Sequence, residues 1–176
     1  MAGYIGNYPT AVPLTSADLN DGIITSAKIA DGTISSADLA SGVGGKILQV
    51  VTATDSTQRS TTSTSFVTAS STLTLSITPS SASNKIFVIC STFIQPDTGQ
   101  DTYITLYRDS TNLGATNGMG NVYSSGTRTN GTISVYDSPS TTSATTYEFR
   151  MKVSGGTSYI NANSIKGSIT AFEIAG

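Results

Sequence analysis

The chain has 176 residues and a formal net charge of −2, and charged residues make up only 11% of it. Because Lys and Arg are few and scattered, we expect no basic surface for DNA or RNA. No apolar run is long enough to span a membrane, so we also expect no membrane insertion. Ser and Thr are abundant and apolar residues recur at every second position, which favours a folded all-β protein over a disordered chain.

The first segment, residues 1–14, has Gly and Pro around Tyr4, Ile5 and Tyr8. This composition predicts an extended arm with apolar anchors, which either frays or docks on another surface. Its start lacks the basic residues and apolar core of a secretory signal. We therefore expect synthesis in a cytoplasm, with release by other means such as cell lysis left open.

Residues 15–44 form three ten-residue repeats without a gap, TSADLNDGII, TSAKIADGTI and SSADLASGVG. The Thr or Ser start of each unit indicates an N-cap that opens one helical turn, Asp-Gly or Ser-Gly closes it, and a short strand follows. A unit this short cannot bury its own apolar side chains, so it needs neighbours, and identical chains around a common axis are the simplest ones. The predicted contacts between chains in this shaft are Leu19, Ile24, Ile29, Ile34 and Leu39.

The glycine-rich residues 42–45 indicate a hinge, after which strands of ordinary length begin. We therefore predict an arm at 1–14, a shaft with its hinge at 15–45, and one domain at 46–176. Candidate strands in that domain, each bounded by turn-forming residues, are 46–54, 65–77, 84–94, 101–108, 131–137, 145–153, 157–162 and 167–174. This number of short strands predicts an antiparallel two-sheet β-sandwich, most plausibly a jelly roll.

Two of the predicted strands are apolar on both faces. In 84–94, Phe87, Ile89 and Phe93 lie opposite a second apolar row, and in 101–108 the same holds for Tyr103 and Tyr107. A sandwich has one interior, so the second face needs another partner, either a covering segment or another subunit. We favour the subunit, because the repeat independently requires one.

The segment 109–130 is rich in Gly and amide side chains and has an exposed aromatic residue. Such residues recognise sugars or protein surfaces, although a long hairpin connection has the same composition. The two interpretations stay open, and the candidate receptor-facing residues are Asn117, Asn121, Tyr123 and Arg128.

Catalytic and metal-binding signals are weak. The chain has no His and a single Cys, Cys90, which we expect to be a core thiol, and we expect no cofactor. Asp97 and Asp101 could hold a calcium ion, but their spacing departs from that of an EF-hand loop. The carboxylates that could form a glycosidase pair are Asp97, Asp101, Asp109, Asp137, Glu148 and Glu173. The four aspartates are better explained as turn and capping residues.

Several of these segments resemble virion proteins of tailed bacteriophages, particularly marine and cyanobacterial ones. The repeats are similar to those of phage shafts, and the start, MAGYIGN, is similar to the starts of such proteins. NKIFV at 84–88, LYRDS at 106–110 and ITAFEIA at 169–175, together with the segment 65–79, resemble the head domains of phage fibres.

The resemblance implies a homotrimer in which Tyr4, Ile5 and Tyr8 anchor the arm to other virion proteins. A short shaft would carry a trimeric jelly-roll knob like those of the tumour-necrosis-factor and complement families. Aromatic residues of one sheet face would then line the threefold axis, and this places Phe87, Ile89, Phe93, Tyr103 and Tyr107 at the knob interface. The shaft is very short for a host-range tail fibre, which favours a short spike or a head-decorating fibre.

The function that we expect is therefore a non-enzymatic structural protein of a virion, assembled in the host cytoplasm. It would dock by its N-terminus and present a knob that contacts a host surface glycan or protein. The first alternative is a capsid decoration or cement protein. The second is a surface-polysaccharide depolymerase with carboxylates at the subunit boundary.

Overall fold

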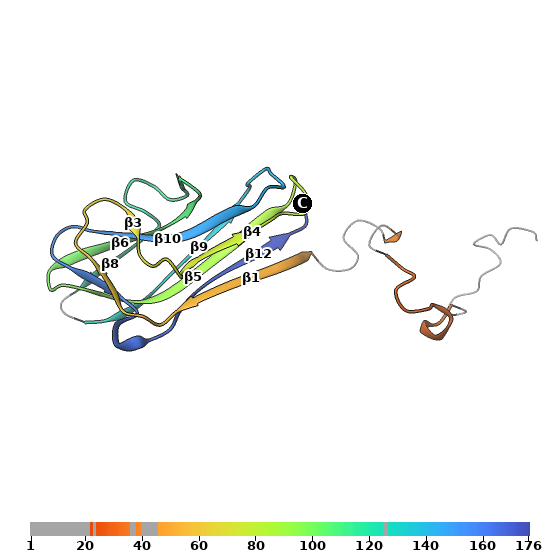
Figure 1. The fold of residues 1–176 in the computed structure, drawn as a ribbon, viewed down its shortest axis with the longest axis horizontal. Helices are drawn as coiled ribbons and strands as arrows, with labels where there is room; N and C mark the ends of the chain where they lie inside the picture. The colour runs from red at the N-terminus through yellow and green to blue at the C-terminus, as the bar shows by residue number, and fades with distance from the viewer. Residues whose placement is uncertain (1–21, 23, 36–37, 40–45, 125–126) are drawn as a thin grey trace, which may run out of the picture. The chain divides into compact units, whose positions relative to one another are not determined.

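A computed structural model describes residues 22, 24–35, 38–39, 46–124 and 127–176. The chain divides into two units, Met1–Gly44 and Gly45–Gly176. The second unit is built almost wholly from strands (Figure 1). Of the helices in the described residues, none is long and apolar enough to cross a membrane.

The strands of the second unit range from two-residue pairings to a strand of twelve residues. They are β1 (Ile47–Asp55), β2 (Arg59–Thr61), β3 (Val67–Thr68), β4 (Thr74–Ile77), β5 (Lys85–Pro96), β6 (Gln100–Arg108), β7 (Thr111–Asn112), β8 (Gly120–Ser124), β9 (Thr129–Asp137), β10 (Thr145–Val153), β11 (Ser158–Ile160) and β12 (Gly167–Ile174). A short 3-10 turn, η4 (Ala162–Ser164), joins β11 to β12.

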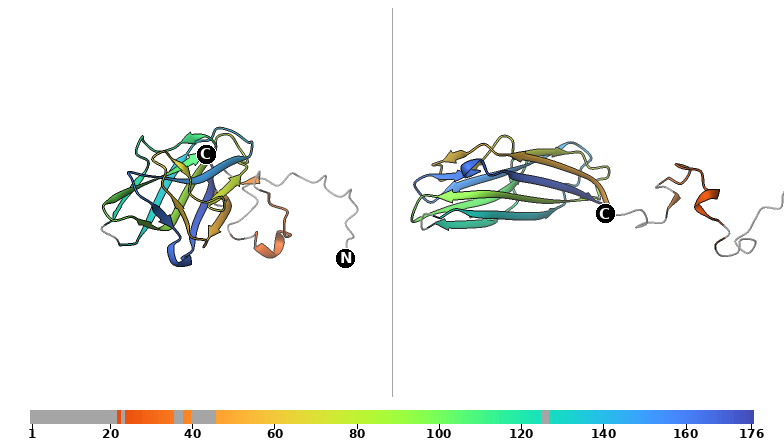
Figure 2. Two further views of the ribbon diagram at one scale, coloured as in Figure 1. Left: turned by 60° about the vertical axis from the view of Figure 1, so that its left-hand side comes forward. Right: turned by 90° about the horizontal axis from the view of Figure 1, so that it is seen from below.

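The strands form two antiparallel sheets that pack as a sandwich. In sheet A the order is β1, β12, β5 and β9. Where the pairing of β12 with β5 ends, β11 pairs with the last residues of β5, and β2 pairs with β11. In sheet B, β10 pairs with β3 and β4 on one side and with β6 on the other, and β6 pairs with β7 and β8. The right-hand view of Figure 2 shows β1, β12, β5 and β9 following one another across sheet A.

The chain passes repeatedly from one sheet to the other, from β2 to β3, from β4 to β5, from β5 to β6, from β8 to β9, from β9 to β10, and from β10 to β11. This alternation gives the predicted jelly-roll sandwich. Because neighbours in each sheet come from distant parts of the chain, the two ends of the unit meet: β1 pairs with β12 from Ile47↔Ile174 to Asp55↔Gly167.

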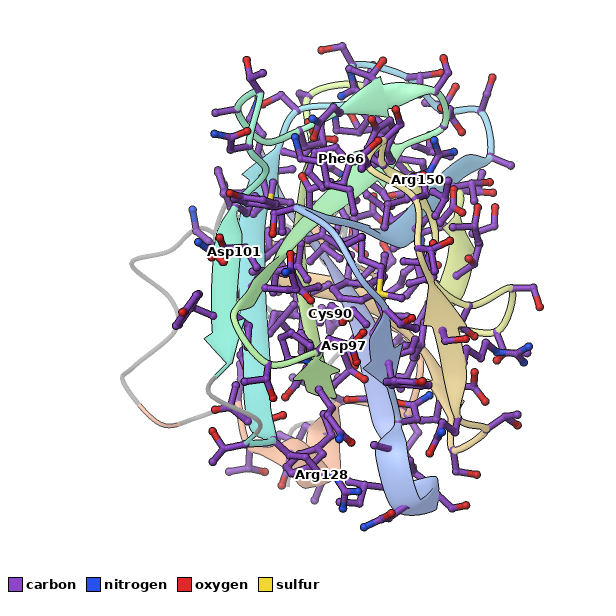
Figure 3. All side chains as sticks on the ribbon, turned by 90° about the vertical axis from the view of Figure 1, so that its left-hand side faces the viewer. Phe66, Cys90, Asp97, Asp101, Arg128 and Arg150 are labelled. Atoms are coloured by element: carbon purple, nitrogen blue, oxygen red, sulfur yellow. The ribbon has the colours of Figure 1, made fainter. Side chains whose placement is uncertain are left out.

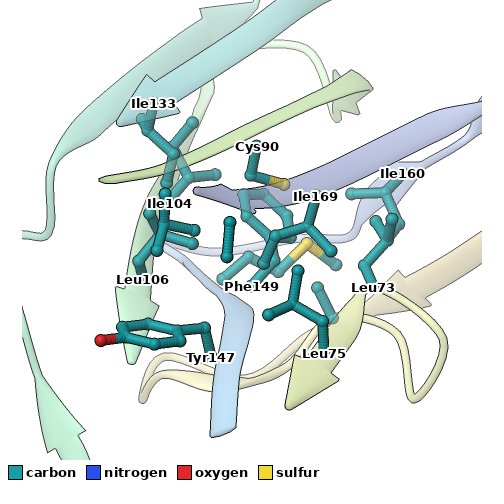
Figure 4. Close-up of a cluster of buried hydrophobic side chains, with 14 of the residues drawn as sticks. Leu73, Leu75, Cys90, Ile104, Leu106, Ile133, Tyr147, Phe149, Ile160 and Ile169 are labelled. Atoms are coloured by element: carbon teal, nitrogen blue, oxygen red, sulfur yellow. The ribbon is translucent and has the colours of Figure 1, made fainter. Parts of the chain in front are cut away.

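The core lies between the sheets and follows the period-two pattern of the sequence. On β10, Tyr147, Phe149 and Met151 are fully buried, while the intervening Glu148, Arg150 and Lys152 face outward. Figure 4 shows side chains of both sheets meeting in this cluster. Cys90 belongs to it, as predicted, and burial raises the pKa of its thiol to about 12.

The segment predicted as one strand at 65–77 is broken into β3 and β4. Between them the chain turns at Ser70, whose hydroxyl donates to Asp55 and accepts from the backbone N–H of Thr72. The inward parity is nevertheless kept, because Ala69 and Leu73 are buried in the core. A Ser-rich stretch that satisfies its own backbone locally has no need of a continuous ladder.

The long connection predicted at 109–130 contains ordered strands. β7 and β8 both pair with β6, so this segment forms the edge of sheet B. The turn between them has Gly118 at φ 84°, a left-handed conformation that favours glycine. A missed strand also occurs at β2, whose three residues are too few to show a period.

In the first unit, the predicted helical turn of the second repeat is the 3-10 turn η2 (Ser26–Lys28). Thr25 is at its N-cap, but its side chain makes no capping hydrogen bond. Gly32 ends the following turn at φ 78°, as the Asp-Gly signal predicts. The short strand predicted after this turn is absent from the described residues 24–35, because an isolated extended segment has no ladder partner here.

Candidate functional site

The outer face of sheet A carries aromatic and aliphatic side chains. On β5 every second residue is fully buried, and Phe87, Ile89 and Phe93 point away from the core and are half-buried. This is the two-faced strand that the sequence predicts. The strand register shows which residues of the neighbouring strands share that outer face.

One register row crosses β1, β12, β5 and β9 of sheet A with apolar side chains. Val50 of β1 pairs with Phe172 of β12, Phe172 pairs with Phe87 of β5, and Phe87 pairs with Tyr136 of β9. The Phe87 and Phe172 rings are 6.2 Å apart between centroids. Val50 is 54% exposed and Tyr136 is 59% exposed. We call these four residues the apolar row.

The apolar row lies near one end of sheet A, and hydroxyl groups replace it toward the other end. The next row contains Thr52, Thr170 and Ser134 beside Ile89, and the row after it contains Ser91 and Thr132. The hydroxyls pair with each other, at 3.1 Å for Thr52 and Thr170 and at 2.9 Å for Ser91 and Thr132. The outer face of sheet A therefore has an apolar end and a hydroxyl-rich end.

Tyr103 and Tyr107 lie on the outer face of the other sheet, since β6 belongs to sheet B. The five residues predicted to line one axis are thus divided between opposite faces of the sandwich. Sequence parity alone gives the two faces of each strand, but it does not show which sheet the strand enters. Of the predicted knob interface, Phe87, Ile89 and Phe93 lie on the outer face of sheet A, whereas Tyr103 and Tyr107 lie on that of sheet B.

The tyrosines of sheet B are covered by side chains of the same chain. The Phe66 ring lies 6.4 Å from the Tyr107 ring, and the Arg150 guanidinium stacks 4.0 Å from the Tyr107 centroid. The Lys152 ammonium lies 4.9 Å from the Phe66 ring and 5.1 Å from the Tyr103 ring. Figure 3 shows Phe66 and Arg150 side by side on this part of the sandwich. The second apolar face of β6 therefore has a covering segment, which is the alternative that we favoured less.

The predicted shaft contacts are exposed in the described part of the first unit. Ile24 is 54% exposed, Ile34 is 51% exposed, and Ile29 and Leu39 are also exposed. In the third repeat, the Asp38 carboxylate accepts hydrogen bonds from the Ser35 hydroxyl and backbone N–H, which lower the pKa of Asp38. The predicted contact Leu19 and the predicted anchors Tyr4, Ile5 and Tyr8 lie outside the described residues.

The four candidate receptor-facing residues have different surroundings. Asn117 is in the turn between β7 and β8, and its Oδ1 accepts a hydrogen bond from Lys152 Nζ at 3.2 Å. Asn121 and Tyr123 point outward from β8, on either side of the buried Val122. Arg128 donates from Nε to Gln95 Oε1 at 2.6 Å, back toward sheet A. The segment therefore brings Asn121 and Tyr123 together and directs Arg128 elsewhere.

A pocket opens between β8 and β9, where the edges of the two sheets separate. Its volume is about 460 Å³, and its lining has hydroxyl and amide groups over the apolar Ile104. The lining residues are Ile104, Gly120, Asn121, Val122, Tyr123, Thr127, Thr129, Asn130, Gly131 and Thr132. At Gly131 an added Cβ atom would lie 2.5 Å from Ile94 Cδ1, so a larger residue here would have to displace that side chain.

The candidate catalytic carboxylates are each engaged by a neighbour in the fold. Asp97 Oδ2 accepts the Thr157 N–H at 2.7 Å, and Asp109 Oδ1 accepts the Thr146 N–H at 3.0 Å, which are the turn roles that the sequence favours. The remaining four bind side chains, namely Asp101 with Asn121, Asp137 with Arg108 and Tyr147, Glu148 with Arg150, and Glu173 with Gln49, Ser80 and Asn84.

Asp137 illustrates such a structural role. It accepts hydrogen bonds from Arg108 at 2.9 Å and from the Tyr147 hydroxyl at 2.6 Å, and so joins sheet A to sheet B. Burial and this carboxylate raise the pKa of Tyr147 well above its ordinary value. Within the described residues, His, Cys, Asp and Glu side chains form no cluster of three that could hold a metal ion.

Comparison with known proteins gives only distant structural similarities. No family model and no curated protein matches the chain. Among solved structures, the chain is similar to the infectious bursal disease virus Gx strain structure, at 14% identity and a TM-score of 0.42, covering 73% of this chain and 37% of that one. It is also similar to a VP2 subviral particle of infectious bursal disease virus, at 14% identity and a TM-score of 0.40. This chain spans little more than a third of the length of those chains.

Proposed function

We propose that this protein is a structural component of a tailed-bacteriophage virion, a short trimeric fibre or spike. Its arm docks on the particle, its repeats form a three-chain shaft, and its sandwich is a knob that adheres to the host surface. The proposal rests on the repeat and motif resemblance of the sequence, together with two surfaces that the described residues of the chain leave exposed.

The observation that carries the proposal is the difference between the two outer faces of the sandwich. On sheet B, Phe66, Arg150 and Lys152 cover the tyrosines of β6. On sheet A, Val50 and Tyr136 keep more than half of their surface exposed in the single chain. An exposed apolar row that spans a whole sheet is typical of a surface that another subunit buries.

The shaft adds an independent reason for a symmetric assembly. Its exposed Ile24 and Ile34 are ten residues apart, as are the exposed Ile29 and Leu39, so exposed apolar side chains recur at the period of the repeat. Three chains around one axis would bury these residues against one another, as each unit cannot do alone. Both units therefore need the same kind of partner, a second and third copy of the chain.

The trimer is tested by the native mass of the purified full chain. We expect a mass close to three chains of 18.1 kDa in sedimentation equilibrium or native mass spectrometry. A mass that remains at one chain through the micromolar range would overturn the trimer. Measurement over a range of concentrations separates a weak trimer from a monomer.

The arm is tested by deletion of residues 1–14. We expect a folded trimer that no longer enters virus particles, because Tyr4, Ile5 and Tyr8 are the proposed anchors. Incorporation at the normal level would contradict the anchoring role. Labelling of complete particles then separates the fibre from a head-decoration protein, since a tail or collar position excludes the latter.

A further inference from the structure

Asp101, Asn121 and Tyr123 form a polar group with one exposed ring at the edge of sheet B. Asp101 of β6 pairs with Tyr123 of β8, and the neighbouring Tyr103 pairs with Asn121. Asn121 Nδ2 donates to Asp101 Oδ1 at 2.9 Å. Tyr123 is 66% exposed, the highest value among the large hydrophobic side chains that the structure describes.

The backbone of Asp101 is held in place from one side. Its N–H donates to Ser154 Oγ at 2.9 Å, and its carbonyl accepts the Ser154 N–H at 3.0 Å. The carboxylate is therefore fixed in position, while one oxygen beyond the Asn121 contact keeps its acceptor capacity. The amide of Asn121 is oriented by the same contact, which leaves its own oxygen to accept a further hydrogen bond.

The pocket between β8 and β9 begins at the same residues. Asn121 and Tyr123 are among its lining residues, and the other lining residues that carry a hydroxyl or amide group are Thr127, Thr129, Asn130 and Thr132. No charged side chain belongs to the described lining. Its volume of about 460 Å³ is within the range of small-ligand sites.

This combination fits a particular ligand chemistry. A sugar ring presents several hydroxyl groups that donate and accept hydrogen bonds, and one flat C–H face that stacks on an aromatic ring. A fixed carboxylate accepts strong hydrogen bonds from hydroxyl donors, whereas it repels a second carboxylate or a sulfate. The nearest cation on that face, Lys152, is already bound to Thr116 O and Asn117 Oδ1.

We propose that Asp101, Asn121 and Tyr123, with the adjoining pocket, bind an uncharged saccharide. The proposal rests on the proposed adhesive function and names the chemical class of its receptor. Asp101 and Asn121 hydrogen-bond to ring hydroxyls, Tyr123 stacks on the ring, and the pocket takes the next sugar unit. Asn117 and Arg128, which the sequence also suggested, do not take part.

The site lies at the opposite end of the sandwich from the start of β1. Ile47 pairs with Ile174, which pairs with Lys85 at the beginning of β5, whereas Asp101 follows the turn beyond the end of β5 at Pro96. The twelve residues of β5 separate the two ends by roughly 40 Å. Figure 3 looks onto this far end, with Asp97 and Asp101 labelled. A site there stays accessible when the apolar row is buried by other copies.

Affinity electrophoresis of the full chain tests the proposal. The native protein runs in gels that contain dextran, mannan or galactan, three uncharged polysaccharides, or alginate, a polymer of sugar acids. We expect slower migration in at least one uncharged polymer and none in alginate. Tyr123→Ala should weaken the retardation roughly tenfold, and Tyr123→Phe, which keeps the ring, should bind within about threefold of the unaltered chain.

Two further variants separate recognition from folding. Asp101→Asn keeps the shape and the contact to Asn121 but loses the charge, and we expect roughly fivefold to tenfold weaker binding. Ile165→Ala removes an exposed apolar side chain that belongs neither to this site nor to the apolar row, and it should leave the retardation unchanged. Absence of retardation in all three uncharged polymers, or equal retardation of Tyr123→Ala and the unaltered chain, overturns the proposal.

The outcome is distinguishable from a failure of the proposed function. A chain with the mass of a trimer that enters particles and binds none of the three polymers retains the fibre function and rejects the saccharide site. A chain that binds an uncharged polymer through Tyr123 but sediments as a monomer retains the saccharide site and rejects the trimeric fibre.

Discussion

At the scale of single residues, Glu173 is a buried carboxylate that depends on several hydrogen bonds. It is fully buried on β12, and among the described residues no cation lies within ion-pair distance of its carboxylate. Its carboxylate accepts hydrogen bonds from Gln49 Nε2, from Asn84 Nδ2, and from both the hydroxyl and the N–H of Ser80. Burial raises the pKa of this carboxyl, but these donors outweigh it and lower the pKa to about 2.

Glu173→Gln should therefore destabilise the protein strongly. The new amide would direct N–H donors at groups that themselves donate, and we expect a loss of roughly 3 kcal/mol in the free energy of unfolding. Urea unfolding at a fixed chain concentration measures it. The matched control is Glu148→Gln, where the carboxylate binds only the partly exposed Arg150, and we expect about 1 kcal/mol or less. Equal losses for the two variants would contradict the special role of Glu173.

The same carboxylate predicts a pH dependence with a definite sign. Because its pKa is lowered from 4.5 to about 2, it stabilises the fold above pH 4.5, and this contribution is lost as the pH falls toward 2. The difference in unfolding free energy between the unaltered chain and Glu173→Gln should narrow by roughly 2 kcal/mol between pH 7 and pH 3. Parallel pH curves for the two proteins would show that Glu173 is not ionised in this way.

At the scale of elements, the turn that joins β7 to β8 decides the edge of sheet B. Met119 N–H donates to Ile104 O at 2.8 Å, and Leu113 N–H donates to Leu106 O at 3.0 Å, so both ends of the turn are tied to β6. Gly118 sits between them, where a Cβ atom would lie 2.5 Å from Ile104 O. The backbone approaches β6 this closely only because Gly118 has no side chain.

Gly118→Ala should destabilise the protein more than Gly99→Ala does. Both glycines have positive φ, 84° and 75°, so each change costs about 1 kcal/mol in backbone strain. Only Gly118 also meets a backbone oxygen, which cannot turn away, and we expect roughly 2 kcal/mol more at that position. Urea midpoints of the two variants provide the comparison, and similar midpoints would mean that the turn can move off β6.

The sequence predicts the elements that have a clear period and a long run. β10 and β12 begin and end where the alternation of their side chains predicts, and the buried parity of β5 is correct throughout. The sequence does not reveal β7 and β8, because glycine and amide residues have the same pattern in a loop and at a sheet edge. Tyr136 and Val50 were also missed as surface residues, although the alternation Thr132, Ser134, Tyr136 carries a visible signal.

At the scale of the whole molecule, the two outer faces of the sandwich differ in how far side chains of the same chain cover them. The face of sheet B packs its tyrosines under Phe66 and two cationic side chains of the same chain. On the face of sheet A, Val50 and Tyr136 of the apolar row stay exposed, and Ile24, Ile29 and Ile34 of the first unit are exposed as well. Which strand enters which sheet depends on contacts between residues far apart in sequence, so only the fold could separate these two faces.

Phe87→Ser with Tyr136→Ser tests the assembly role of sheet A. Phe87 is half-buried and Tyr136 is exposed, so the pair should leave the sandwich folded while it removes the middle and one end of the apolar row. We expect about 2 kcal/mol lost at each interface, or about a 30-fold rise in its dissociation constant, read as a shift from three chains to one in sedimentation equilibrium. Phe66→Ser with Tyr123→Ser, a half-buried and an exposed ring on sheet B, should keep the mass of three chains. If the sheet A variant stays trimeric and the sheet B variant dissociates, the interface lies on the tyrosine face and the covered ring of Phe66 must move to admit a neighbour.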